Sequence, residues 1–178
     1  MRPMYLLALL VLLCAQLQGC AVYGVARDER TVGTIVDDRV IITNLKKELL
    51  VMNSSEGYAT KVYSYSGRVF LVGEVAPTFR DRAVEQAHRT NGVRSVTTHW
   101  VNPGVGKTGD DIVTESKVRS ALIADGSLSS TQIDSEVYGG HVVLLGVVGS
   151  QADSKRATDV ARKVGGVRSV TTYIMIDK

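Results

Sequence analysis

The chain repeats itself, and this duplication restricts its possible folds more than any other feature. The seven residues Gly-Val-Arg-Ser-Val-Thr-Thr at 92–98 recur unchanged at 166–172. An aspartate pair recurs at nearly the same spacing, as Asp37-Asp38 and again as Asp110-Asp111. An identical heptapeptide with matches upstream indicates two copies of one structural unit rather than chance similarity. We place the copies at residues 37–101 and 110–178, joined by a linker at 102–109.

Each copy shows the same order of local patterns. Apolar residues spaced by four predict a helix after the aspartate pair, and two β-rich runs separated by a glycine-containing turn predict a hairpin. A second helix carries small residues at a spacing of four, which would let it lie close to a sheet. A final strand follows a glycine that stops this helix. The small residues are Ala83 and Ala87 in the first copy, and Ala157 and Ala161 in the second.

The order of these patterns predicts the fold class. A strand, helix and strand in succession form a crossover, so the last strand should run parallel to its neighbour, whereas the hairpin is antiparallel. We therefore predict an α+β protein of two tandem αββαβ units, each with a three-stranded mixed sheet packed on two helices. A unit of about 65 residues has a marginal core, so we expect the two units to pack on each other.

The first 20 residues have the layout of an export signal. Arg2 precedes an uncharged apolar run at residues 5–15, which is shorter than the ~20 residues that span a bilayer. The run leads into Leu17-Gln-Gly-Cys20, which resembles the lipobox of bacterial lipoproteins. That resemblance implies a signal peptide at residues 1–19, cleavage before Cys20, and acylation of the Cys20 sulfur and amino group. We expect residues 20–36 to hold this lipid anchor and a tether.

Composition argues against several classes of function. A net charge of +3 over 178 residues is too mild to predict a nucleic-acid partner. Cys14 lies in the signal, so Cys20 is the single cysteine after cleavage and no internal disulfide is expected. The three histidines are widely separated and lack zinc-ligand spacing. We expect no metal and no cofactor.

The sequence lacks a complete motif for nucleotide binding or for a serine nucleophile. Gly104-Val-Gly-Lys-Thr108 resembles the end of a phosphate-binding loop, but Val101 occupies the position of the required first glycine. We therefore expect no nucleotide binding. The sequence has no Gly-x-Ser-x-Gly elbow for a serine nucleophile. We predict a protein that is not an enzyme and has no catalytic residues.

The repeat resembles a known family. The αββαβ pattern, the glycine ending the second strand and the Gly-Val-x-x-Val before the last strand are similar to the BON domain of bacterial envelope proteins. Residues 111–122 and 165–172 are the most specific stretches. A lipobox followed by two such domains resembles the dual-BON outer-membrane lipoproteins associated with division and envelope stress. That resemblance implies a lipid-anchored protein on the periplasmic face of the outer membrane, and Ala21 after the anchor fits this sorting.

The resemblance also implies a ligand and its site. In that family the second BON domain binds anionic phospholipid through its first helix and supports outer-membrane integrity, with accumulation at division sites. Helical spacing puts Val118 and Leu122 on the core side of this helix and leaves a broad outer side. We expect apolar residues there to dip into headgroups and two cations to meet phosphates. The predicted lipid-binding residues are Ile112, Ser116, Lys117, Arg119, Ser120 and Ile123.

Charge limits this hypothesis. The second copy carries nine acidic against eight basic residues, so any attraction to anions must come from local clustering. The family's helix can begin with a tryptophan, and Asp111 stands near that place. An acid at a bilayer surface would weaken binding and leave more of it to the two cations. A second basic group is interpreted as a solvated helix face: Lys155, Arg156, Arg162, Lys163 and Arg168.

Two functional hypotheses follow, from different classes. The first is a lipid-anchored module that binds anionic phospholipid. The alternative is an envelope scaffold that docks on outer-membrane assembly proteins through its sheet edges or helices. Lipid binding would fall with salt and with charge reversal at Lys117 or Arg119, whereas a scaffold would ignore vesicles and co-purify with a protein.

Overall fold

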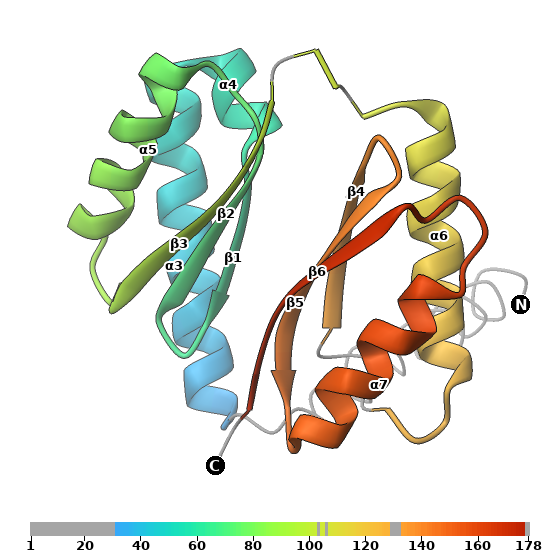
Figure 1. Ribbon diagram of the computed structural model, residues 1–178. Helices are drawn as coiled ribbons and strands as arrows, with labels where there is room; N and C mark the ends of the chain where they lie inside the picture. The colour runs from blue at the N-terminus through green and yellow to red at the C-terminus, as the bar shows by residue number, and fades with distance from the viewer. Residues whose placement is uncertain (1–30, 103, 106, 129–132, 177–178) are drawn as a thin grey trace, which may run out of the picture.

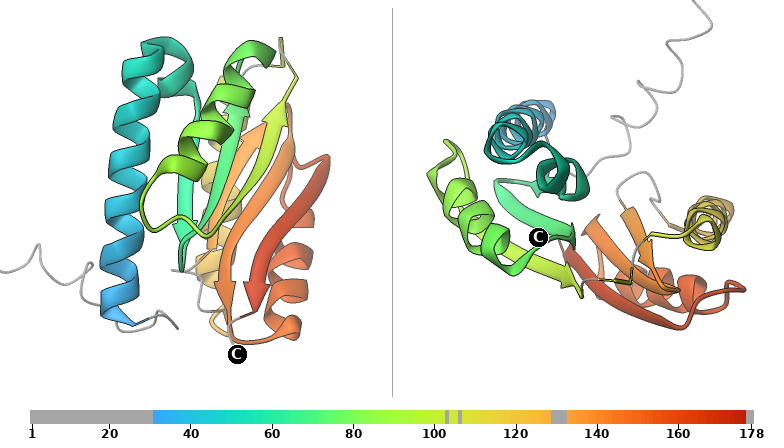
Figure 2. Two further views of the ribbon diagram at one scale, coloured as in Figure 1. Left: turned by 90° about the vertical axis from the view of Figure 1, so that its left-hand side faces the viewer. Right: turned by 90° about the horizontal axis from the view of Figure 1, so that it is seen from above.

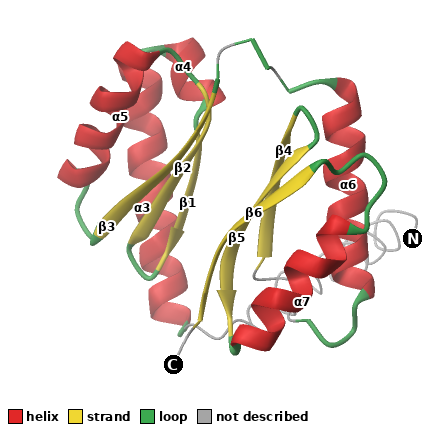
Figure 3. Cartoon of the chain, in the orientation of Figure 1, coloured by secondary structure: helices red, strands yellow, loops and turns green. Residues whose placement is uncertain are grey.

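The computed structural model of the chain describes residues 31–102, 104–105, 107–128 and 133–176 (Figures 1 and 3). Two similar units follow one another. The first unit consists of α3 (Val32–Met52), α4 (Ser54–Ala59), β1 (Lys61–Tyr65), β2 (Arg68–Glu74), α5 (Pro77–Arg89) and β3 (Ser95–Val101). The second consists of α6 (Gly109–Ala124), β4 (Ile133–Tyr138), β5 (His141–Val148), α7 (Gln151–Arg162) and β6 (Ser169–Ile176).

Each unit contains one three-stranded mixed sheet. The strand orders are β1-β2-β3 and β4-β5-β6. In both sheets the hairpin strands are antiparallel, and the last strand lies parallel to the central one. The predicted fold class is therefore confirmed, including the parallel pairing across each crossover.

The helices of each unit pack on its sheet through small and apolar residues. The four alanines predicted to face the sheets, in α5 and α7, are all fully buried. Pro77 opens α5, where its missing N–H costs no hydrogen bond. Ile41, Leu45 and Leu49 of α3 are buried against the same sheet. Each unit thus has its own core between its helices and one face of its sheet.

The central strands are buried on both faces. In β2, Val69 and Leu71 belong to the core beneath the helices, whereas Phe70 and Val72 point to the other side. That other side packs against the sheet of the second unit, in a third cluster that includes Val143 and Leu145 of β5. The molecule is therefore a four-layer arrangement of helices, sheet, sheet and helices (Figures 1 and 2). The expectation that the two units pack on each other is confirmed.

Polar groups join the two sheets as well. The Tyr63 hydroxyl donates to Oε1 of Glu136 at 2.6 Å, and the Tyr65 hydroxyl donates to Oδ2 of Asp134 at 2.6 Å. Burial and the nearby Glu136 raise the pKa of Tyr63, which keeps its proton available for donation. These directional bonds fix one sheet against the other more specifically than apolar contact alone.

Three features of the first unit differ from expectation. Helix α3 begins at Val32, so residues 32–36 form its first turns instead of ending a tether. The aspartate pair of this copy therefore lies inside the helix, and α3 has no acidic residue in its first turn. Helix α4 was not predicted. Lys46 fixes it by donating from Nζ to the carbonyls of Gly57 at 2.6 Å and Thr60 at 2.5 Å.

Candidate functional site

Helix α6 is held by a capping box and by its apolar inner side. Thr108 caps the helix by accepting from the N–H of Asp111, and the Asp111 carboxylate accepts from the N–H of Thr108 at 3.0 Å. Val118 and Leu122 are buried against the sheet of the second unit, as their spacing predicted. The inner side is thus fully used by packing, and the outer side is exposed.

The structure exposes all six predicted lipid-binding residues on the outer side of α6. Ile112 and Ile123 are 60% and 62% exposed, and their spacing of eleven residues places them on the same face of the helix. Sequence reasoning missed Val113, which is 52% exposed beside them. Its position four residues before Lys117 was the available signal, because residues four apart lie on the same face of a helix.

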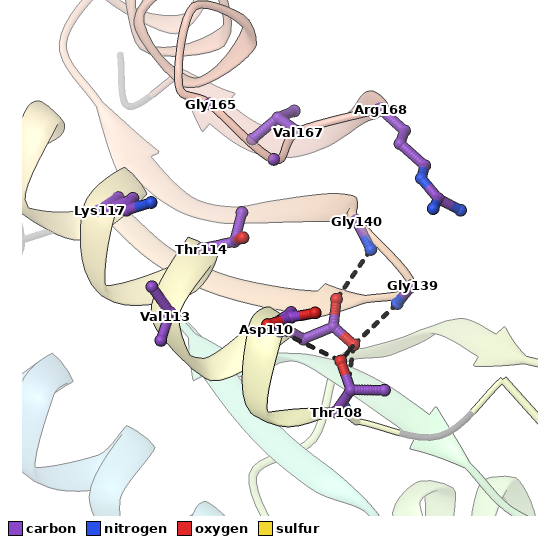
Figure 4. Close-up of a pocket in the computed structure, with 12 residues that line it drawn as sticks. Thr108, Asp110, Val113, Thr114, Lys117, Gly139, Gly140, Gly165, Val167 and Arg168 are labelled. Carbon is purple, nitrogen blue, oxygen red and sulfur yellow. Dashed lines mark hydrogen bonds between the residues drawn. The ribbon is translucent and has the colours of Figure 1, made fainter.

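The two predicted cations lie on different flanks of α6. Arg119 reaches toward β4, where its guanidinium lies 4.0 Å from Oδ1 of Asp134. Lys117 lies on the opposite flank, at a hollow of about 660 Å³ between α6, the β4–β5 turn and the loop before β6 (Figure 4). Arg168 borders the same hollow from that loop. Positive charge therefore stands on both flanks of the exposed isoleucines.

Asp111 does not lie at the surface, which corrects the expectation that it would weaken membrane contact. The residue is 2% exposed. Its carboxylate accepts from the N–H of Gly140 at 2.8 Å and of Gly139 at 3.0 Å, shown as dashed lines in Figure 4. Burial alone would raise the pKa of Asp111, but the donors from Thr108, Gly140 and Gly139 outweigh it and hold the pKa below its usual value. Asp111 therefore fixes the hairpin turn to α6.

The first unit has a similar hollow beside its own aspartate, but one cation borders it instead of two. Asp38 accepts from the N–H of Ser66 at 2.7 Å and of Gly67 at 2.9 Å, as Asp111 does in the second unit. A hollow of about 600 Å³ lies beside it and is bordered by Arg94. Asn44, six residues after Asp38, stands where Lys117 follows Asp111. The second unit is therefore the more positive of the two at this position.

Two arginines of the second basic group, both on α7, and the linker lysine Lys107 are engaged in ion pairs. Arg156 lies 2.8 Å from Asp125, and Arg162 lies 3.8 Å from Asp159. Lys107, from the loop that resembled a phosphate site, pairs with Glu115 and with the buried Glu136. Burial acts to lower the pKa of Lys107, but its bonds to the two glutamates outweigh this and raise it. This lysine ties the linker to the second unit.

None of the helices within the described residues combines the length and the apolar character needed to cross a membrane. Cys20 and the signal-like segment lie outside the described residues.

The fold defines a class of protein: two αββαβ units that pack sheet to sheet, with helices on the two outer faces. The profile of the BON domain matches residues 37–99 and 110–177, so the chain belongs to the BON-domain family and carries two such domains.

Relatives support this assignment. The chain is 32% identical to outer membrane lipoprotein DolP of Haemophilus influenzae, over 96% of this chain and 95% of that protein. It is 30% identical to the 21 kDa hemolysin of Actinobacillus pleuropneumoniae, over 83% and 78% of the two chains. It is 32% identical to osmotically-inducible protein Y of Escherichia coli, over 78% and 72%.

Proposed function

We propose that this protein is an outer-membrane lipoprotein, anchored through Cys20 on the periplasmic face, that binds anionic phospholipid through α6 and supports membrane integrity, including at division sites. The observation that carries the proposal is the pair of exposed isoleucines on α6 with cations on both flanks. The similarity to a relative named as an outer-membrane lipoprotein, which extends over 96% of this chain, supports the location.

The expected affinity is weak, and the anchor makes it sufficient. A cation close to an anionic leaflet contributes about 1 kcal/mol, so Lys117 and Arg119 together contribute about 2 kcal/mol. Partial burial of Ile112 and Ile123 adds about 2 kcal/mol, since full burial of such a side chain gives about 1.5–3. A total near 4 kcal/mol corresponds to a Kd of about 1 mM. Anchoring through Cys20 would supply an effective concentration in this range.

Binding of the chain without its anchor tests the proposal. Every buried residue of the described chain lies between Asp38 and Ala161, so a chain beginning at Ala21 keeps the packed structure. It should sediment with excess vesicles containing phosphatidylglycerol, less with pure phosphatidylcholine, and less as salt rises.

Charge reversal supplies matched variants. Arg119→Glu changes two charges, about 2 kcal/mol, so vesicle affinity should fall about thirtyfold. Arg162→Glu is the control, because the two arginine side chains are 60% and 61% exposed but Arg162 lies on α7. Equal affinity of both variants would refute lipid binding by α6. A wild-type chain that ignores vesicles and captures an envelope protein would favour the scaffold hypothesis instead.

A further inference from the structure

Helix α3 of the first domain is apolar on two sides. Its inner side carries the buried residues Ile41, Leu45 and Leu49. Its outer side carries Val32 and Val36, which are 64% and 55% exposed and follow at a spacing of four. Val40, Leu50 and Val51 extend the exposed apolar residues along the helix. Such a run of exposed apolar residues along one helix is typical of a surface that contacts a partner or a membrane.

Basic side chains of α3 lie on this outer side, whereas its acidic side chains point away from it. Arg39 and Lys47 follow Val36 by three and eleven residues, spacings that keep them on the same face of a helix. Asp37 and Glu48 each come one residue after a member of that face and therefore turn away from it. Lys46 and Lys47 also border a shallow groove of about 570 Å³ with Leu50 and Val51. The outer side is thus apolar and basic, which is suited to an anionic apolar surface.

One edge of α3 faces the second domain across a small hollow. Ile35, Arg39 and Ile42 of α3 line a hollow of about 180 Å³ whose far wall includes Asp134 of β4. Asp134 is also the residue that faces Arg119 of α6, at 4.0 Å. Helix α3 packs beside β1 on the outer face of the first sheet, whereas α6 packs beside β4 and α7 on the outer face of the second, so Figure 2 shows them in the two outer layers. The outer side of α3 is therefore a surface distinct from that of α6, although Asp134 lies close to both helices.

We propose that α3 is a second lipid-contacting helix, whose apolar and basic outer side binds an anionic bilayer as α6 does. This inference rests on the proposed function, because it takes the same ligand and uses the same anchor. Eleven residues, 21–31, separate Cys20 from α3, and an extended chain spans at most about 3.5 Å per residue. The start of α3 is therefore held within roughly 40 Å of the leaflet that carries the anchor.

Environment-sensitive labels at single sites test this surface. The chain beginning at Ala21 contains no cysteine, because Cys14 and Cys20 precede it, so an introduced cysteine is the single labelling site. We would attach a nitrobenzoxadiazole probe to Val36→Cys, to Ile112→Cys and, as a control on α5, to Arg82→Cys. Each is titrated with phosphatidylglycerol vesicles that contain doxyl-labelled lipid. Probes at 36 and 112 should shift to the blue and be quenched, whereas the probe at 82 should respond to neither.

The outcomes separate the two proposals. A response at 112 with no response at 36 would overturn the role of α3 and leave the proposed function standing. No response at 112 would count against the proposed function itself. Lys47→Glu should weaken vesicle binding by about thirtyfold, as two charges change, whereas Arg82→Glu, with the same charge change on α5, should leave it unchanged. Equal binding of these two variants would also overturn the inference.

Discussion

Replacing Asp111 with alanine removes the side chain that links α6 to the β4–β5 turn of the second BON domain by hydrogen bonds. The carboxylate accepts four hydrogen bonds, from the N–H groups of Thr108, Gly139 and Gly140 and from the Thr108 hydroxyl. The N–H of Gly140 is buried, so in the variant it loses its partner without access to water. The other donors are partly buried, and water can replace part of what they lose.

The expected loss of stability follows from the different burial of these donors. An orphaned buried donor costs about 1–3 kcal/mol, and each partly exposed bond contributes about 0.5–1 kcal/mol. The sum is a loss of about 3 kcal/mol in the free energy of unfolding. For a chain of this length, 1 kcal/mol corresponds to about 2–4 °C in Tm, so Tm should fall by about 6–12 °C. Thermal and urea unfolding followed by circular dichroism at pH 7 would measure this loss.

The pH dependence gives a second measure with a definite sign. The pKa of Asp111 is held below its ordinary value of 3.8 in the folded protein. The carboxylate therefore stabilises the fold fully above about pH 4, and this contribution is lost as pH falls through the lower folded pKa. The stability difference between the native protein and Asp111→Ala should be constant from pH 5 to pH 7 and shrink below pH 4.

Asp110→Ala is the matched control, since this neighbouring acid is exposed in the same turn. It should change the free energy of unfolding by less than about 0.5 kcal/mol. A loss below 1 kcal/mol for Asp111→Ala, or equal losses for the two variants, would refute the conclusion that Asp111 stabilises the contact between α6 and the β4–β5 turn.

Three other substitutions test the packing by the same unfolding measurements. Lys107→Met should cost about 3 kcal/mol, because it leaves the buried Glu136 without its cation; a loss under 1 kcal/mol would contradict this pairing. Gly140→Ala should cost at least about 2 kcal/mol, because φ is 78° and an added Cβ would lie 2.8 Å from the carbonyl oxygen of Gly166; native stability would show that the turn adapts. Tyr63→Phe should cost about 1 kcal/mol by removing the hydrogen bond to Glu136 between the sheets, and no change would show that this bond contributes little.

Much of the candidate site was accessible from the sequence, because helical spacing is a local property. The positions of Val118 and Leu122 indicated the inner side of α6, and the six predicted lipid-binding residues then fell on the outer side. The role of Asp111 was not accessible in this way. Its partners, Gly139 and Gly140, lie 28 and 29 residues along the chain, and spacing within one helix carries no information about such distant groups.

The sequence by itself determined the duplication, the order of the elements that the two units share and the helix residues that face each core. It could do so because an identical heptapeptide and the periods of helices and strands are written in consecutive residues. Only the tertiary structure decided what covers the second face of each sheet. The run Val69–Val72 is apolar without interruption, and such a run does not state its partner. The packing of sheet on sheet supplies that partner, and it places α3 and α6 in the two outer layers.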